Sequence, residues 1–308
     1  ATVGYCLSSF SSGPFVSRIG IGSLLMLSSI IRGVGLLGYA LSPTWWVMVS
    51  SGLLIGIGGG TIDAGVNTYV AANYSAGLMN WLHASWGLGA ALGPLIMTTV
   101  LNMGQSWRWG YVIIGVLQGL FAVCYGFTLS AWRFGSTRHL DSEPGALEAK
   151  SGSPAGRVGS SATLKLPVVW LSIALFFVFT GIEGAAGQWT YSLFTEARSV
   201  ASSTAGLWIS IFWGSFTVAR LISGLVVDRI GILSLLRLSM LGGICGAAFI
   251  WWNVANVLGF LGLALVGLSL GPIFPSLIAN TPRRFGVEHA ANAIGFQIGA
   301  ASLGVGIL

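Results

Sequence analysis

Long apolar runs alternate with short polar loops along nearly the whole chain. A helix needs about 20 apolar residues to cross the hydrocarbon core of a bilayer. The runs that reach or approach this length lie at 1–16, 22–41, 46–71, 80–102, 109–131, 166–190, 204–227, 232–252, 256–280 and 290–308. The pattern predicts an all-α membrane protein with about ten transmembrane helices.

The chain also repeats itself at an offset of 211 residues. Residues 12–25 read SGPFVSRIGIGSLL and residues 223–236 read SGLVVDRIGILSLL, so ten of the fourteen positions are identical. The same offset pairs Gly56 with Gly267. Because six apolar runs separate the two copies, both have the same orientation, and we expect a parallel repeat of two six-helix halves.

The repeat predicts how the chain is divided. We expect an N-terminal half at 1–132 and a C-terminal half at 166–308. Between them, residues 133–165 are rich in Gly, Ser, Pro and charge, which indicates a flexible linker. The equivalents of the runs 166–190 and 109–131 would lie before the first residue and after the last. The expected architecture therefore lacks helix 1, the start of helix 2 and helix 12 of a twelve-helix protein.

Composition supports the membrane interpretation, since 54% of the residues are hydrophobic and 7% are charged, against about 25% charged in soluble domains. Arg18 and Arg229 lie in loops on the same side as the basic linker, whereas Arg108 and Arg198 lie on the other side. The positive-inside rule then places the linker in the cytoplasm and the protein in the inner or plasma membrane. The net charge of +6 thus reflects topology and not nucleic-acid binding. The three cysteines have no metal-site spacing, and no cofactor is expected.

One carboxylate stands inside the run 46–71, at Asp63, with Asn67 one helical turn further on. An uncompensated carboxylate in lipid costs at least about 2.5 kcal/mol. Desolvation disfavours its charged form, so an acid at this depth is suited to carry a proton. We expect Asp63 to act in ion or substrate traffic. The alternative is a structural pairing with a nearby arginine. Arg32 in the run 22–41 could pair with Asp63 or with a group on the missing helix 1, or it could equally hold a structural or snorkelling position.

Asn80, His83 and Trp86 recur at helical spacing and so share one face of the run 80–102. Asn and His offer hydrogen bonds, and Trp offers a flat apolar surface on which a sugar ring could stack. A lone His in a helix is more often structural, but the shared face makes all three candidates for substrate binding.

Three further candidates lie in the second half. Glu183 is an acid inside the run 166–190, and its burial cost favours a substrate or gating role over an interfacial position. Trp189 either lines the outer cavity or belongs to the interfacial aromatic belt. Gln297, in the last run, is a weaker candidate for substrate binding.

The two repeat copies carry a loop pattern that resembles the signature of the major facilitator superfamily. The residues are Gly13, Ser17, Arg18 and Gly20 in the first copy, and Gly224, Asp228, Arg229 and Gly231 in the second. In that family the signature joins helices 2 and 3 and, in weaker form, helices 8 and 9. Ser17 here replaces the usual Asp. The resemblance implies gating roles for Arg18, Asp228 and Arg229, and we expect Arg220 to help hold the gate with Asp228.

A narrower pattern is similar to the fucose-permease-like branch of that superfamily. It consists of Asp63-Ala-Gly-Val-Asn67, the run Met79 to His83 followed by Trp86, and Gly181-Ile-Glu183 with Trp189-Thr-Tyr191. The resemblance implies secondary transport, often of sugars with protons, and proton coupling at the acid that matches Asp63.

We therefore predict proton-coupled symport of a small polar solute such as a sugar by alternating access. The expected partners are that small molecule, protons and the lipid bilayer, with no nucleic acid, and the protein is expected to be a monomer. One alternative is an efflux antiporter, which Gly89-x-x-x-Gly93-Pro94 would allow. Another is a polytopic binding or sensing protein without transport. No catalytic constellation is seen, so we do not predict an enzyme.

Overall fold

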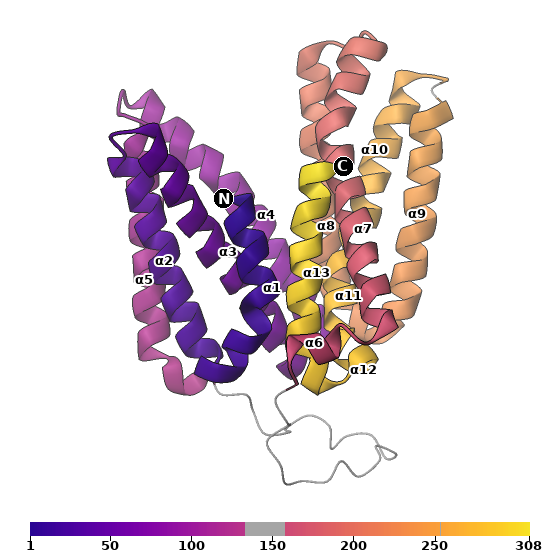
Figure 1. Ribbon diagram of the computed structural model, residues 1–308. Helices are drawn as coiled ribbons and strands as arrows, with labels where there is room; N and C mark the ends of the chain where they lie inside the picture. Colours follow the sequence, from indigo (N-terminus) through magenta and orange to yellow (C-terminus); the bar gives the residue numbers. More distant parts are fainter. Residues whose placement is uncertain (133–157, 253) are drawn as a thin grey trace. The chain divides into compact units, whose positions relative to one another are not determined.

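The computed structural model describes residues 1–132, 158–252 and 254–308, and these residues are almost entirely helical with no strand among them (Figure 1). Helices satisfy their own backbone hydrogen bonds, as the hydrocarbon region requires. They are α1 (Thr2–Ile19), α2 (Ile21–Leu41), α3 (Trp45–Asn73), α4 (Ala76–Asn102), α5 (Arg108–Phe127), α6 (Ser160–Thr163), α7 (Pro167–Ser192), α8 (Ser202–Ile230), α9 (Ile232–Trp252), α10 (Asn256–Leu270), α11 (Ile273–Ala279), α12 (Thr281–Phe285) and α13 (Val287–Ile307), with a 3-10 turn at Leu129–Ala131 and a π turn at Leu193–Ala197.

The predicted membrane spans are confirmed as helices. Within the described residues, eight helices are long and apolar enough to cross a membrane. The predicted runs 1–16 and 80–102 form α1 and α4, which are not among these eight. The predicted run 256–280 is divided into α10 and α11, with Gly271 and Pro272 between them. Proline at 272 has no N–H to continue the helical hydrogen bonds, which accounts for the break.

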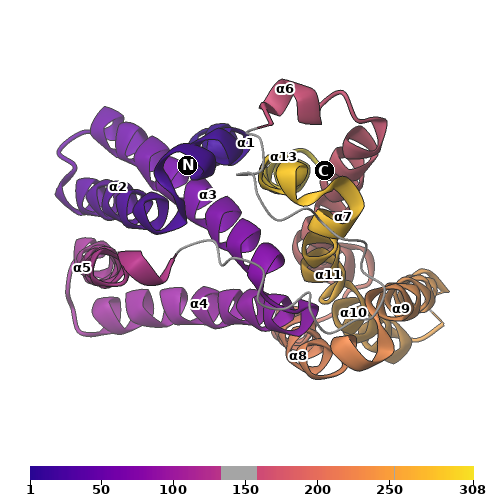
Figure 2. The same cartoon turned by 90° about the horizontal axis from the view of Figure 1, so that it is seen from below.

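The described chain forms two compact units. The first consists of residues 1–73, 97–174 and 281–302, and the second of residues 74–96, 175–280 and 303–308. Within the first unit α2 packs on both α3 and α5, and α1 packs on α3 (Figure 2). Within the second unit α10 packs on both α8 and α9. These units follow spatial contacts and not the repeat, so the division into halves at 1–132 and 166–308 stays a prediction.

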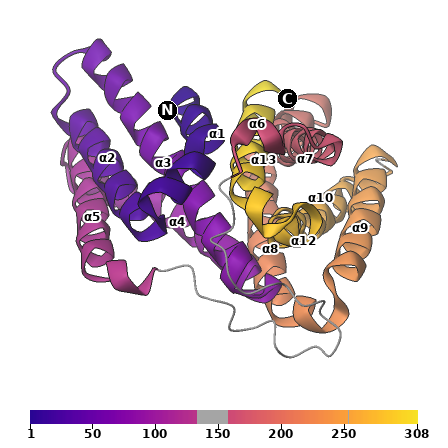
Figure 3. The same ribbon diagram turned by 60° about the horizontal axis from the view of Figure 1, so that its bottom comes forward.

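Part of the predicted linker is ordered. Residues 133–157, where flexibility was expected, lie outside the described residues, but the last residues of the predicted linker form α6 beside α13 (Figure 3). The Asn292 amide on α13 donates to Val158 O at 3.0 Å and to Thr163 Oγ1 at 3.1 Å. His289, on the same helix, lies 3.0 Å from Thr163 Oγ1 through its Nδ1. The linker as predicted therefore ends with a segment that is fixed to α13.

The internal repeat is visible in backbone conformation. Gly20, between α1 and α2, has φ 77° and donates its N–H to Val16 O. Gly231, between α8 and α9, has φ 81° and donates to Val227 O. Both pairs of residues are related by the offset of 211 found in the sequence. Positive φ favours glycine, so the signature glycines at these turns have a steric cause.

The repeat is also visible in helix packing. An ideal Cβ placed on Gly35 of α2 would lie 2.9 Å from Ser51 O on α3. An ideal Cβ on Gly246 of α9 would lie 2.7 Å from Gly262 O on α10. Gly246 and Gly262 are the equivalents of Gly35 and Ser51 at the same offset. The helix pairs α2–α3 and α9–α10 therefore cross with the same close contact, through small residues, as is common in membrane helices.

Gly35→Ala is expected to lower the free energy of unfolding by about 1–3 kcal/mol, the usual cost of overpacking. The added methyl group would meet backbone atoms of α3, which cannot move aside as a side chain can. Thermal unfolding in detergent measures the effect. Gly119→Ala on α5 is the control, because nothing lies within 4 Å of its ideal Cβ. Equal melting temperatures for the two variants would contradict the close contact.

Candidate functional site

The carboxyl group of Asp63 has a hydrogen-bond donor on each of its oxygens. The Tyr5 hydroxyl on α1 donates to Oδ2. The Asn67 amide donates to Oδ1 at 2.8 Å and to the Asp63 main-chain oxygen at 2.9 Å. Asn67 is fully buried, while Asp63 and Tyr5 are half-buried. The two predicted residues therefore form one unit, in which Asn67 fixes the orientation of Asp63.

Two glycines of α3 explain how Tyr5 reaches Asp63. Ideal Cβ atoms on Gly56 and Gly60 would collide with the α1 backbone at Ala1 and Tyr5. The absence of side chains at these positions lets α1 lie directly on α3 one turn before Asp63. Tyr5 was missing from the candidates because a single Tyr in an apolar run has no pattern of its own. The glycine pair was the signal that could have indicated a close neighbour.

Arg32 lies half-buried where α2 packs on α3. An ideal Cβ placed on Gly58 of α3 would lie 2.7 Å from the Cβ of Arg32. The Arg32 side chain therefore starts in contact with α3, five residues before Asp63. Its charge lies close enough to act on Tyr5. Its Nε has no hydrogen-bond partner among the described residues. This position keeps Arg32 a candidate charge partner for Asp63.

Arg220 is the central polar residue of the second unit. It is 4% exposed, and it donates from Nε to Gly271 O and from Nη1 to His83 O, both at 3.0 Å. Its Cζ lies 4.1 Å from the centroid of the Phe216 ring, a cation–π distance. Residue 275 is a proline and has no N–H to give Gly271 O, four positions earlier. Arg220 therefore supplies the donor that the helix itself cannot.

Arg220 and Asp228, which we expect to hold the gate together, have different hydrogen-bond partners in the structure. Asp228 is exposed and its Oδ1 accepts the Gly77 N–H at 3.3 Å, in the first turn of α4, where a carboxylate is favourable. Eight residues separate Arg220 from Asp228 along α8, a rise of about 12 Å. Arg220 therefore bonds to the main-chain oxygens of Gly271 and His83, and its role in holding the gate with Asp228 stays a prediction. Arg18 and Arg229 are exposed, and their gating roles stay predictions.

Asn80 and His83 on α4 are both buried, as their predicted shared face requires. The Asn80 amide donates to Ala76 O at 2.9 Å and to Ser276 Oγ on α11 at 3.5 Å. Its Oδ1 has no partner among the described residues. The His83 ring lies 5.1 Å from that of Phe274. These two residues face α11, which the sequence did not indicate.

Trp86, the third residue of that face, has a different environment. It is 56% exposed, with its ring 6.4 Å from Trp213 and 6.0 Å from the Arg220 guanidinium carbon. The Trp86 ring is therefore largely exposed, beside the buried guanidinium group of Arg220. Trp213 and Phe216, both on α8, are members of this cluster that sequence reasoning missed, because aromatic residues in an apolar helix carry no distinct signal.

Glu183 and Trp189 lie on α7. Glu183 is half-buried, and its role in substrate binding or gating stays a prediction. Trp189 is 65% exposed, which suits either of its predicted positions.

Gln297 has a structural role in the first unit. It is 2% exposed, its Nε2 donates to Ser172 Oγ on α7 at 2.8 Å, and its Oε1 accepts from Thr281 Oγ1 on α12 at 3.1 Å. Both ends of the amide are occupied in joining α13 to its neighbours. Substrate binding by Gln297, as predicted from its place in an apolar run, is therefore not supported.

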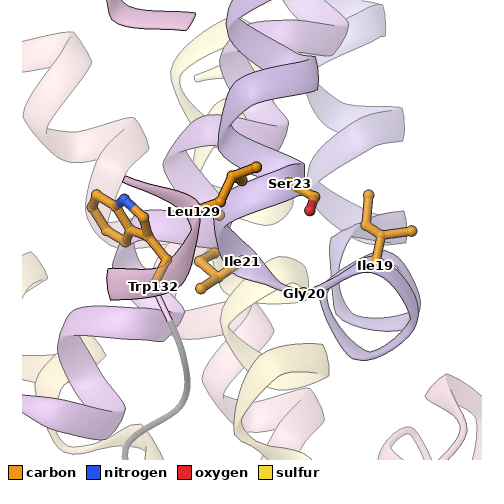
Figure 4. A pocket seen from close by; sticks show the side chains of 7 residues that line it. Ile19, Gly20, Ile21, Ser23, Leu129 and Trp132 are labelled. Carbon is orange, nitrogen blue, oxygen red and sulfur yellow. The ribbon is translucent and has the colours of Figure 1, made fainter. Parts of the chain in front are cut away.

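A pocket of about 330 Å³ opens at the turn between α1 and α2 (Figure 4). It is mostly apolar and contains none of the predicted substrate or proton residues. Its lining residues are Ile19, Gly20, Ile21, Gly22, Ser23, Leu129 and Trp132.

The family model described as Major Facilitator Superfamily matches residues 1–308. The Saccharomyces cerevisiae "Bypass of stop codon protein 6" is 24% identical over 94% of this chain and 64% of its own length. The glucose/mannose transporter GlcP of Bacillus subtilis is 24% identical over 82% of this chain and 61% of its own. The chain thus spans less than two thirds of these curated relatives.

Solved structures share the fold. The proton:xylose symporter XylE, bound to 6-bromo-6-deoxy-D-glucose, matches with a TM-score of 0.74 at 15% identity, covering 99% of this chain and 76% of its own. FucP in its outward conformation matches with a TM-score of 0.75 at 12% identity, covering 99% and 79%. At these identities the likeness concerns the arrangement of helices alone.

Proposed function

Because the chain belongs to the major facilitator superfamily, we propose that it is a secondary active transporter that carries a sugar or similar polyhydroxylated solute together with protons by alternating access. The single observation that supports this proposal most is the carboxyl group of Asp63. It lies within an apolar helix, and hydrogen-bond donors hold both of its oxygens. A fold alone would not need such a group, since an intramembrane acid is costly.

The solute part of the proposal is supported by the cluster around Arg220. The buried guanidinium group of Arg220 lies beside the exposed ring of Trp86, and Asn80 and His83 are buried on the same helix as Trp86. Aromatic faces with a few convergent hydrogen-bonding groups suit sugars, whose rings have apolar faces and hydroxyl edges. GlcP is named as a glucose/mannose transporter, and a second relative, 23% identical, as a human sodium-dependent glucose transporter. A sugar is therefore the first solute to test, and sodium the first rival to the proton.

The test is uptake by the purified protein in liposomes. Labelled glucose, xylose and fucose are offered under an imposed gradient that is alkaline inside, and in a separate arm under an inward sodium gradient. We expect one sugar to accumulate under the pH gradient, and an uncoupler to abolish the accumulation. Accumulation under sodium alone would contradict proton coupling. Movement of solute against the direction of proton flow would indicate an antiporter, and binding without counterflow would indicate a sensor.

A further inference from the structure

We propose that Tyr5 is the hydrogen-bond switch through which Asp63 gains and loses its proton. The inference rests on the proposed proton coupling and assigns a positioning residue to it. In the structure Tyr5 and Asn67 both act as donors to the carboxyl group, Tyr5 to Oδ2 and Asn67 to Oδ1. Two donors suit an ionised carboxylate, which can only accept hydrogen bonds.

The two donors differ in what they can do when a proton arrives. The Asn67 amide nitrogen also donates to the Asp63 main-chain oxygen, which fixes the nitrogen on that side. An amide NH₂ group cannot accept a hydrogen bond, so a proton on Oδ1 would break this contact. A hydroxyl can both donate and accept, so a proton on Oδ2 only requires Tyr5 to reverse its role. Protonation therefore belongs on Oδ2, facing Tyr5.

Protonation of Asp63 needs one reactant, a hydronium ion. An O–H bond forms between the incoming proton and Oδ2, and water is left. The Tyr5 hydroxyl rotates its own hydrogen away and accepts from the new Asp63 hydroxyl. Release to water on the other side reverses the sequence. No covalent bond of Tyr5 breaks, and nothing is oxidised or reduced.

α1, α2 and α12 pack on α3. Tyr5 comes from α1, and Arg32 from α2 is the cation close enough to act on Tyr5. α12 also packs on α3, and its charged residues Arg283 and Arg284 are exposed. Tyr5 on α1 is thus a donor to the Asp63 carboxylate that comes from a neighbouring helix.

The second repeat copy serves as an internal control. At the offset of 211, Tyr5 corresponds to Phe216 and Asp63 to Phe274. The backbone contact is nevertheless the same, because an ideal Cβ on Gly271, the equivalent of Gly60, would lie 2.5 Å from Phe216 O. The helix crossing therefore forms without a hydroxyl or a carboxyl group. The Tyr5–Asp63 pair is not needed for packing, which favours a chemical role in the first copy.

The test follows the protonation of Asp63 directly, so that it does not depend on which solute is carried. The infrared band of protonated carboxyl groups is titrated with pH in the full-length protein, and the part that Asp63→Asn removes is assigned to Asp63. Tyr5→Phe removes one donor from the ionised form. We expect the titration midpoint to rise by about one to two pH units, the effect of losing a hydrogen bond to a charged group. Tyr39→Phe on α2, whose ring packs 5.2 Å from Tyr111, is the matched control and is expected to leave the midpoint unchanged.

A midpoint in Tyr5→Phe equal to that in Tyr39→Phe would overturn the proposal. A general loss of structure is separated by a double variant, because Tyr5→Phe should change no carboxyl band when Asp63→Asn is already present. A band change in that background would also overturn it. Failure of every sugar to accumulate would contradict the proposed function, while the titration would still decide the role of Tyr5.

Discussion

Asp63→Asn is expected to abolish solute accumulation while leaving solute exchange intact. We expect this variant to have the largest effect on function. For one proton per solute, a gradient of one pH unit can sustain about tenfold accumulation, since a tenfold ratio corresponds to about 1.4 kcal/mol. An amide of the same size keeps an oxygen for Tyr5 but cannot take up and release a proton in this range. The variant should equilibrate the solute to an inside-to-outside ratio of about one.

The measurement compares labelled solute in liposomes under a pH gradient with counterflow in its absence. Glu196→Gln, at an exposed carboxylate outside the described site, is the matched control and should accumulate solute as the wild type does. An Asp63→Asn protein that still accumulated solute would remove Asp63 from proton coupling. Loss of both accumulation and counterflow would instead place Asp63 in solute binding or in folding.

Arg220→Gln is expected to have the largest effect on both stability and solute binding. The guanidinium group makes two buried hydrogen bonds, to Gly271 O and His83 O, and Gly271 O lacks a helical donor because Pro275 has none. Charged hydrogen bonds contribute about 1.5–3 kcal/mol each, so we expect the free energy of unfolding to fall by about 3 kcal/mol or more. Solute affinity should fall at least about tenfold, as for a loss of about 1.4 kcal/mol.

Thermal unfolding in detergent and equilibrium solute binding measure the two effects. Arg237→Gln on α9 is the control, since Arg237 is exposed. Arg220→Lys separates charge from geometry, because an ammonium group cannot present the planar fork that reaches two carbonyl oxygens. Unchanged stability in Arg220→Gln would contradict the contacts described, and unchanged binding would remove Arg220 from the solute site.

The helices could be predicted from the sequence because bilayer thickness sets a length that apolar runs must meet. The run 232–252 coincides with α9, and the run 46–71 lies within α3. The repeat was equally readable, since glycines at tight turns and close crossings have few substitutes. The pair Asp63 and Asn67 was predictable because four residues make one helical turn, so the contact is local.

Contacts between helices were not predictable in the same way. Nothing in an apolar run distinguishes Tyr5 from a lipid-facing tyrosine, and its role depends on how closely α1 approaches α3. The acceptors of Arg220 are backbone oxygens on α4 and after α10, which no pattern along α8 indicates. The contacts of Gln297 with Ser172 and Thr281 were not predictable, because a helical pattern does not show whether an amide faces a cavity or a neighbouring helix.

The bend between α10 and α11 is held by a side chain from another helix. The hydrogen bond that a carbonyl oxygen accepts within its own helix breaks only when that helix unwinds. The main-chain oxygen of Gly271, in contrast, accepts a hydrogen bond from Arg220 on α8. A tilt of α11 must therefore either move Arg220 as well or break this hydrogen bond. A bound molecule that drew the Arg220 guanidinium group away from Gly271 O would therefore weaken the contact that holds the bend between α10 and α11. Through this contact, α8 would couple the binding of that molecule to the angle of α11.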